Sequence, residues 1–512
     1  MLATVLAAAL YTPGLDVSPP HLLHDEIKFA LQAKSIADTG RDLNGRLLPV
    51  YFLEGGFAVG RDPICIYVTA AVLKLLPLSE KSIRLPSALL GAFCVGLTFI
   101  LARLIFGRDL LAWVAAGLMA LTPTYFIHSR LALSVVYPIP FTLLWLTALV
   151  LYLSSPRPRY AAACGVLAGL GVYSYLGAAI LMPLYFVATI GVLATRRDRR
   201  GIIAAVTGFA VTLLPIVWWQ FVEPDRYAQI VVAYRLNETQ AAGPLERLLE
   251  LTSGAGLRRR LDTFWEAFNP SRLFFSGESS LHISTRLVGS FLLSVAVFLA
   301  LGIRHLLQTP RTPLGAVLLF GLVSAPLPAV IMLDVEIRRW LILVPFAILV
   351  ATFGVERLLQ SGRRARAICV LLLALMPLQF LAFGRDYFGP YRERASFWFG
   401  GNIRGALETL LEADQTPTVV YISEEIPWVE AYWRFYTTVH SQRALLERTH
   451  YVRLHAAPIA ELPRPIPGAM VVAPAQEIEA AERLASAGWE QAHVIREPDG
   501  KASFTIYARS GT

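Results

Sequence analysis

The sequence predicts an all-α polytopic membrane protein with a small soluble α/β domain at its carboxyl end. Of its 512 residues, 55% are hydrophobic and 16% are charged, whereas a soluble protein carries about 25% charged residues. The mean hydropathy is +0.54, and the chain contains many apolar runs close to the roughly 20 residues that cross a bilayer. These observations exclude a disordered chain and argue against an ordinary cytosolic enzyme.

Eleven apolar segments account for the predicted membrane domain, residues 1–384. The first, Met1–Leu15, is short and lacks the basic flank of a signal peptide, so we interpret it as a helix that is clipped by the start of the chain or partly embedded. An odd number of spans places the two chain ends on opposite sides of the membrane. The other ten runs lie near 84–105, 110–127, 133–153, 160–177, 178–194, 201–221, 286–303, 313–331, 339–359 and 367–383.

The positive charge of the chain follows this topology. The net charge is +9, and one set of alternate short loops holds fourteen arginines against three acidic residues. Loops rich in arginine face the cytoplasm, so the basicity reports orientation and predicts no nucleic-acid partner. The arginines are Arg103, Arg108, Arg157, Arg159, Arg196, Arg197, Arg199, Arg200, Arg304, Arg311, Arg357, Arg363, Arg364 and Arg366.

Three larger pieces then lie on the opposite, extracytoplasmic side. They are a loop at about 16–83, a loop at about 222–285, and the soluble domain at 385–512. Within this last domain, alternating and helical patterns predict short strands, two helices and a closing hairpin. The strands are Pro417–Ile422 and Ala469–Val472, the helices are Ile426–Tyr436 and Gln476–Ala487, and the hairpin turns at Asp499–Gly500. The four cysteines show no spacing typical of a disulfide framework or a zinc site.

The first large loop carries the acidic pair Asp25 and Glu26 at the start of a helical pattern. Two interpretations stay open. Carboxylates in a first helical turn favour the positive end of the helix dipole, and a carboxylate just above the bilayer could instead be catalytic for a lipid-linked substrate. Arg61 and Asp62 follow in the same loop, among glycines and prolines that indicate tight turns.

Three further arginines on the extracytoplasmic side are not explained by the topology rule. Arg130 lies in a short outer loop, and Arg338 and Arg339 follow two acidic residues, Asp334 and Glu336. Each arginine could pair with an acidic neighbour or extend to the interface, or it could hold a phosphate through bidentate hydrogen bonds. His128 and Glu278 are further candidates for the polar lining of a site.

These motifs, in this order and spacing, resemble the bacterial GT-C membrane glycosyltransferases of the dolichyl-phosphate-mannose–protein mannosyltransferase family, which include the aminoarabinose transferases of lipid A. The similarity covers most of residues 20–385. Here Asp62 directly precedes Pro63, where the family often has a basic residue. The motifs are His24-Asp25-Glu26, Gly40-Arg41-Asp42, Arg61-Asp62-Pro63, Arg84-Leu85-Pro86, His128-Ser129-Arg130, Phe274-Phe275-Ser276-Gly277-Glu278 and Arg338-Arg339.

The resemblance implies an inverting glycosyltransferase of the GT-C fold in the bacterial inner membrane. It would move a hexose or pentose from a polyprenyl phosphate to a periplasmic acceptor: lipid A, another lipid, a glycan or a protein. The family's first-loop Asp, here Asp25, is the catalytic base, with Glu26 beside it. A divalent metal ion is the one cofactor left open, with Asp25 and Glu26 as its candidate ligands, and no nucleotide is expected. The expected substrate-binding residues are Arg61, Asp62, His128, Arg130, Glu278, Arg338 and Arg339.

Chemistry agrees with a single base, because a phosphate leaving group needs no protonation by a second carboxylic acid. Three other functions remain as alternatives. A lipid or glycan flippase predicts ionisable residues along the spans. An O-antigen-type ligase of another GT-C branch predicts that basic outer residues dominate over Asp25. A non-enzymatic assembly subunit predicts that replacing Asp25 has no effect.

Overall fold

The computed structural model describes residues 1–512 except 55–56, 225–252, 310–311, 414–415, 456–462 and 510–512, and the side chains of 53–61 also lie outside the description. The chain divides into two compact units. The first contains residues 1–13, 38–69 and 84–384, and the second contains residues 14–37, 70–83 and 385–512. Parts of the first large loop thus belong to the same unit as the carboxyl-terminal domain.

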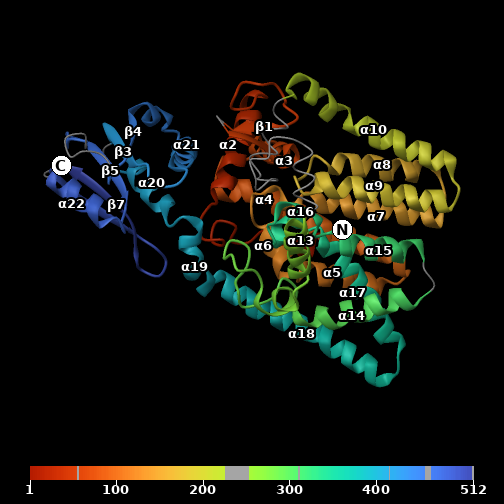
Figure 1. The fold of residues 1–512 in the computed structure, drawn as a ribbon. Helices are drawn as coiled ribbons and strands as arrows, with labels where there is room; N and C mark the ends of the chain where they lie inside the picture. Colours follow the sequence, from red (N-terminus) through yellow and green to blue (C-terminus); the bar gives the residue numbers. More distant parts are fainter. Residues whose placement is uncertain (55–56, 225–252, 310–311, 414–415, 456–462, 510–512) are drawn as a thin grey trace. The chain divides into compact units, whose positions relative to one another are not determined.

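The first unit is helical apart from a short hairpin, and the prediction of a polytopic α-helical fold is confirmed (Figure 1). Antiparallel β1 (Phe52–Glu54) and β2 (Phe57–Arg61) form the hairpin. The helices are α1 (Leu2–Tyr11), α3 (Pro63–Leu73), α4 (Glu80–Phe106), α5 (Asp109–Ala120), α6 (Pro123–Ser129), η1 (Ser134–Val136), α7 (Pro138–Ser154), α8 (Pro158–Gly171), α9 (Ala178–Thr195), α10 (Arg199–Val222), α13 (Gly254–Ala267), η2 (Arg272–Ser276), α14 (Leu293–Gln308), α15 (Pro313–Ser324), α16 (Leu327–Met332), η3 (Ile337–Arg339), α17 (Leu343–Gln360) and α18 (Arg363–Phe388).

Fewer of these helices are long enough to cross a membrane than the eleven expected. Within the described residues, seven helical segments are sufficiently long and apolar, and an eighth forms if the bent pair α5 and α6 counts as one span. The bend of 64° falls at Thr122, directly before Pro123, because the residue before a proline avoids helical backbone angles. Three other predicted segments correspond to α1, α8 and α14, whose lengths of 10, 14 and 16 residues fall below a full span.

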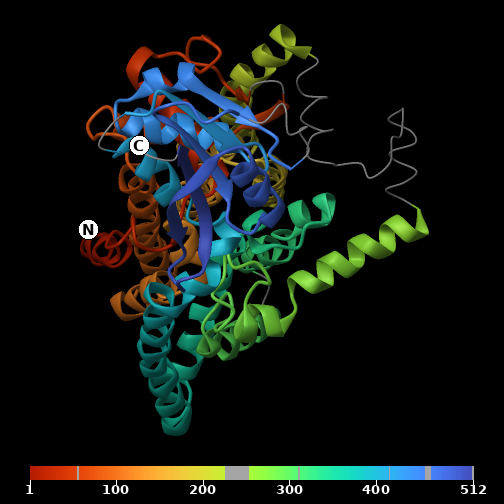
Figure 2. The same cartoon turned by 90° about the vertical axis from the view of Figure 1, so that its left-hand side faces the viewer.

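Helices α7, α8, α9 and α10 run beside one another (Figure 1). Figure 2 shows the same fold turned by 90°. Close approach of α8 to α10 depends on a small residue, since a Cβ atom at Gly165 would overlap the backbone carbonyl of Ala205. Small residues at such crossings increase the van der Waals contact that holds helices together in a membrane, where lipid removes the usual hydrophobic driving force.

The second unit contains α2 (His24–Thr39) and a domain built on a five-stranded sheet. The strand order is β4-β3-β5-β7-β6; the first three strands are parallel, and β7 and β6 are antiparallel to their neighbours. The strands are β3 (Val419–Ser423), β4 (Thr449–Val452), β5 (Ala469–Pro474), β6 (Trp489–Arg496) and β7 (Ala502–Arg509). The helices are α19 (Pro390–Ala395), η4 (Ser396–Phe399), α20 (Ile403–Leu411), α21 (Val429–Val439), η5 (Arg443–Arg448) and α22 (Ile478–Ser486).

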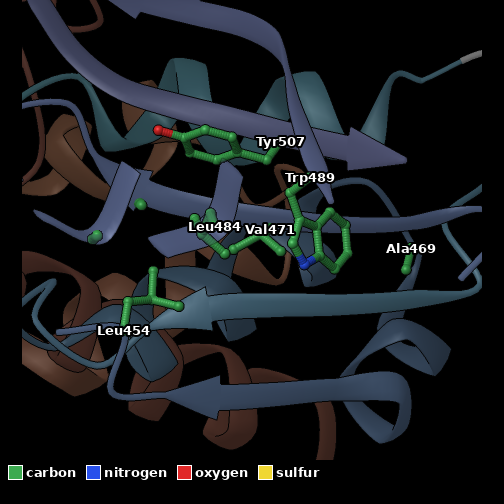
Figure 3. Packing of buried hydrophobic residues seen from close by; sticks show 8 residues of the cluster. Leu454, Ala469, Val471, Leu484, Trp489 and Tyr507 are labelled. Carbon is green, nitrogen blue, oxygen red and sulfur yellow. The ribbon is translucent and has the colours of Figure 1, made fainter. Parts of the chain in front are cut away.

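The prediction of a small α/β domain is confirmed, including the Asp499–Gly500 turn between β6 and β7. Its core lies on one face of the sheet, where Trp489 and Tyr507 pack around Val471 and against Leu484 of α22 (Figure 3). The buried indole of Trp489 also donates a hydrogen bond to the carbonyl of Pro463 at 2.7 Å. Burying large apolar side chains of this kind stabilises the domain by roughly 1.5–3 kcal/mol each.

Hydrogen bonds tie the early segments of the chain to the sheet domain within this second unit. Nε2 of His21 lies 2.6 Å from Oγ of Ser396, and the hydroxyl of Tyr436 donates to Glu80 at 2.7 Å. Ser396 also donates to Glu497, which accepts from the N–H of Asn402 at 2.8 Å as well. Burial alone would raise the pKa of Glu497, but the hydrogen bonds from His21, Ser396 and Asn402 outweigh it and lower that pKa to about 2.

Candidate functional site

The first turn of α2 carries Asp25 and Glu26, and their carboxylates have different surroundings. Glu26 is fully buried, and its Oε2 accepts a hydrogen bond from the backbone N–H of Leu23 at 2.9 Å. This is one half of a capping box, since it satisfies an N–H that the helix itself leaves without a partner. The side chain of Asp25 is 33% exposed, and its Oδ1 lies 3.4 Å from Nε2 of His24. Glu26 therefore stabilises the helix start, whereas Asp25 is reachable from outside.

An aromatic residue of the sheet domain lies against this first turn. The rings of Trp428 and His24 stack with centroids 5.3 Å apart and an interplanar angle of 11°. Nζ of Lys28, one turn further along α2, lies 3.3 Å from the ring centroid of Trp428, a cation–π contact. The indole remains 49% exposed. Sequence reasoning missed Trp428 and Lys28, because their contact joins residues some four hundred positions apart.

In the first unit, the loop before α17 holds two cations that differ in what they bind. Nε of Arg339 donates a hydrogen bond to Asp334 at 2.6 Å. Burial alone would raise the pKa of Asp334, but the positive charges of Arg339 and Arg338 outweigh burial and hold that pKa below its usual value. Arg338 is 40% exposed and makes ion pairs with Glu336 at 2.5 Å and Asp334 at 3.5 Å. The 2.5 Å contact with Glu336 is made by Nε, so Arg338 is held by ion pairs on a side chain that stays partly exposed.

Glu278 and Arg272 brace this loop from the preceding segment. Oε1 of the buried Glu278 accepts a hydrogen bond from the N–H of Ile337 at 3.2 Å. Arg272 forms a close ion pair with Glu278 and donates to the carbonyl of Val335 at 3.1 Å. Glu278, expected to bind substrate, therefore contacts the backbone directly before Arg338. Arg272 was not predicted as a site residue, since its role depends on a carbonyl 63 residues away.

A small pocket lies beside this loop and includes the connection between α8 and α9. Tyr175, Arg338 and Arg339 contribute its polar lining, and the Tyr175 hydroxyl lies beside the Arg339 guanidinium. The backbone reaches this close because residue 177 is glycine: a Cβ there would stand 3.0 Å from the carbonyl oxygen of Arg339 and from the ring of Tyr175. Gly177 thus sets the distance between the two segments.

Two predicted residues, Asp62 and His128, are close enough to act electrostatically on this region. Asp62 interacts electrostatically with Tyr175. Its Oδ2 accepts a hydrogen bond from the hydroxyl of Ser134 at 2.6 Å. The charge of Arg338 reaches the imidazole of His128. His128 is buried; its Nδ1 lies 2.7 Å from the carbonyl of Thr124, and its Nε2 has no hydrogen-bond partner among the residues that the structure describes. The first unit therefore brings Asp62, His128, Arg338 and Arg339 into one region.

Arg130 contacts the end of the first helix. Arg130 is fully buried, and its Nη1 donates to the carbonyls of Tyr11 at 2.6 Å and Pro13 at 2.8 Å, so it fixes the end of α1. The backbone of Arg61 ends β2, but its side chain lies outside the described part of the chain. Arg130 therefore has a structural role at α1, and its role in substrate binding stays a prediction.

In the part of the chain that the structure describes, the expected metal ligands Asp25 and Glu26 belong to no group of three or more metal-ligating side chains. Among the described residues, the one group of three or more metal-ligating side chains consists of Glu425, His455 and Glu477. Oε2 of Glu26 accepts a hydrogen bond from the N–H of Leu23. A metal ion at Asp25 and Glu26 thus stays a prediction from the resemblance, and no step proposed below depends on one.

Comparison of the sequence with family models identifies one matching region. Residues 61–219, about a third of the chain, match the model described as dolichyl-phosphate-mannose-protein mannosyltransferase. This range includes Asp62, His128, Arg130 and Tyr175. No curated protein sequence matches the chain.

Two solved structures share the fold over nearly the whole chain. ArnT from Cupriavidus metallidurans, bound to undecaprenyl phosphate, has a TM-score of 0.54 at 14% identity, covering 100% of this chain and 98% of ArnT. The Archaeoglobus fulgidus oligosaccharyltransferase, tethered to an acceptor peptide, has a TM-score of 0.51 at 16% identity, covering 99% of this chain and 74% of that protein. The chain therefore has the GT-C fold that these structures share, and its residues 61–219 match the dolichyl-phosphate-mannose-protein mannosyltransferase model.

Proposed function

We propose that this protein transfers a sugar from a polyprenyl phosphate to an acceptor at the periplasmic face of the bacterial inner membrane, with inversion at the sugar carbon. The observation that carries the proposal is the state of Arg338, a guanidinium on a braced loop that is 40% exposed and whose charge is balanced only by partly exposed ion pairs with Glu336 and Asp334. The mannosyltransferase domain match supports the same chemistry. So does the fold shared with ArnT, which was crystallised with undecaprenyl phosphate.

Arg338 would bind the donor phosphate. Its ion pairs with Glu336 and Asp334 are partly exposed and contribute little, about 0–1 kcal/mol. A phosphate offers bidentate, charge-assisted hydrogen bonds that contribute about 1.5–3 kcal/mol each. Exchange of Glu336 for a phosphate is therefore favourable. Arg339 would remain on Asp334 and add positive charge to the pocket.

Asp25 would be the general base. The acceptor hydroxyl or amine attacks the anomeric carbon, its proton passes to the Asp25 carboxylate, and the carbon–oxygen bond to the phosphate breaks. The bonding electrons leave with the polyprenyl phosphate, whose charge the arginines stabilise. A base in this role contributes about 10²–10⁴-fold to the rate. Asp25 suits it because it is partly exposed, whereas the neighbouring Glu26 is buried and hydrogen-bonded to the backbone.

The orientation follows from the arginine-rich loops. These loops face the cytoplasm by the positive-inside rule, so the outer loops and the sheet domain would lie in the periplasm. The sugar and the acceptor stay open among hexoses and pentoses, and among lipid A, other lipids, glycans and proteins.

Mass spectrometry of extracted lipids and envelope glycans tests the proposal in a deletion strain and its complemented parent. We expect one product of the parent to lose a single sugar residue in the deletion strain, while the polyprenyl-phosphate-linked sugar accumulates. Identical lipids, glycans and donor levels in the two strains would contradict the proposal. If the deletion strain lacks the product but its detergent extracts still transfer the sugar, the protein would act in transport rather than in transfer.

A further inference from the structure

Three metal-ligating side chains meet in the sheet domain. They are Glu425, His455 and Glu477, and one ligand atom of each lies within 4.8 Å of the others. Each follows a different parallel strand: Glu425 comes after β3, His455 after β4 and Glu477 after β5. Because these strands are adjacent in the order β4-β3-β5, the three side chains gather at the carboxyl edge of the parallel part of the sheet. This edge is where α/β sheets bind ligands.

The donor atoms have the spacing of a metal site without its ion. Nδ1 of His455 lies 2.6 Å from Oε1 of Glu425. The ligand atom of Glu477 lies within 4.8 Å of the ligand atoms of the other two residues. Tetrahedral zinc with bonds of about 2.1 Å separates its ligand atoms by about 3.4 Å, between these two values. Small side-chain rotations therefore suffice to place all three atoms around one ion.

The surrounding contacts orient the ligands. Ser423 donates a hydrogen bond to Oε2 of Glu425, which leaves Oε1 facing His455. Within the described chain, Oε1 of Glu425 and Oε2 of Glu477 are buried atoms with no hydrogen-bond donor directed at them. Arg483 donates to the backbone carbonyl of His455 and so holds the residue from outside. Such second contacts are typical of metal ligands.

We propose that Glu425, His455 and Glu477 bind a divalent transition-metal ion of the zinc type, with water as the remaining ligand. One imidazole nitrogen and two carboxylate oxygens form a ligand set that suits zinc. The ion neutralises two carboxylates that lie together at the sheet edge. It also joins the ends of three strands and fixes the loop from Glu425 to Trp428, the residue that stacks on His24. The site stands independently of the glycosyltransferase function.

The alternative is an ordinary ion pair between His455 and Glu425. That pair needs no third residue, so it does not explain why Glu477 converges on it. The two interpretations differ in a measurable way, since only a metal site makes zinc affinity depend on Glu477 as well as on His455.

The test uses the full-length protein in detergent, without an affinity tag and stripped with EDTA. Zinc is then titrated, and bound zinc per chain is measured after dialysis; cobalt absorption reports the geometry. We expect one zinc ion per wild-type chain, at least tenfold weaker binding in Glu477→Gln and His455→Asn, and no change in Glu424→Gln. Glu424 lies beside Glu425 but pairs with Arg453 at 2.8 Å and is not one of the ligands.

Each outcome decides the proposal. Zinc should raise the melting temperature of the wild type and of Glu424→Gln but not of the ligand variants. Asp25→Asn should bind zinc as the wild type does, which separates this site from the first loop. Equal zinc affinity in the wild type, Glu477→Gln and His455→Asn would overturn the proposal. If His455→Asn does not fold, Glu477→Gln and the cobalt spectrum of the wild type decide in the same way.

Discussion

The buried carboxylate of Glu26 accepts a hydrogen bond from the backbone N–H of Leu23 at 2.9 Å. This contact separates two adjacent acidic residues by function. Glu26 completes the cap of α2, and Asp25, one residue earlier, presents a partly exposed carboxylate beside His24. The hydrogen bond of Glu26 thus fixes the first turn of α2, and with it the backbone position of Asp25.

Replacement of Glu26 should therefore affect stability more than chemistry. Glu26→Ala removes the acceptor for the Leu23 N–H and should lower the free energy of unfolding by about 1 kcal/mol. Glu26→Gln keeps an acceptor oxygen and should retain both stability and transfer. Thermal unfolding in detergent and transfer assays measure the two effects. A stable Glu26→Gln protein without activity would show that Glu26 takes part in the reaction.

Replacement of Arg338 should weaken use of the donor. Loss of its charge-assisted contacts, about 1.5–3 kcal/mol, should lower kcat/KM for the polyprenyl-phosphate sugar about 10- to 100-fold in Arg338→Ala. Arg338→Lys should recover part of the loss, since lysine keeps the charge but not the bidentate geometry. Arg103→Ala is the matched control, because Arg103 is exposed and pairs with Asp109. Unchanged kinetics in Arg338→Ala would mean that Arg338 does not bind the donor and only forms ion pairs within the loop.

Replacement of Gly177 should disturb the arginine loop without touching any charge. The added Cβ of Gly177→Ala would stand 3.0 Å from the carbonyl oxygen of Arg339, so the loop must move by a few tenths of an ångström. We expect reduced transfer and a lower melting temperature. Gly191→Ala lies inside α9, which begins directly after Gly177, and has open space around its Cβ position, so it should leave both unchanged. Equal behaviour of the two variants would mean that the Gly177 contact does not position Arg339.

Glu497 should make the second unit sensitive to acid. Its pKa is about 2 in the folded protein, against an ordinary value of 4.5, so the unfolded chain takes up the proton first as pH falls. The stabilisation is fully present above about pH 4.5 and is lost as pH falls towards 2. Glu497→Gln should lower stability by about 2 kcal/mol at pH 7, and the difference should shrink at pH 3. Melting curves at both pH values test this, with the exposed Glu490→Gln as control.

The sequence supports accurate prediction where structure is local. The apolar runs locate the helices, and Asp499–Gly500 locates a hairpin, since turn chemistry depends on adjacent residues. The apolar segments predicted at α8 and α14 differ from the helices in their bounds, because apolar residues continue past one end of each helix.

Site residues were predicted less completely, for a physical reason. Arg130 was singled out for its position, yet its partners are the carbonyls of Tyr11 and Pro13, far away in sequence. Trp428 gave no signal, because its importance arises from contact with His24 and Lys28. Long-range contacts of this kind leave no spacing pattern in the chain.

The central claim is that Asp25 removes the acceptor proton, and one measurement tests it most directly. Asp25→Asn keeps the size of the side chain but removes its basicity. Envelope products are compared by mass spectrometry in strains carrying the wild type, Asp25→Asn and the deletion, at matched protein levels. We expect that the strain carrying Asp25→Asn lacks the same sugar residue as the deletion strain, although the variant protein is folded and inserted. A full amount of the sugar in the Asp25→Asn strain would contradict it.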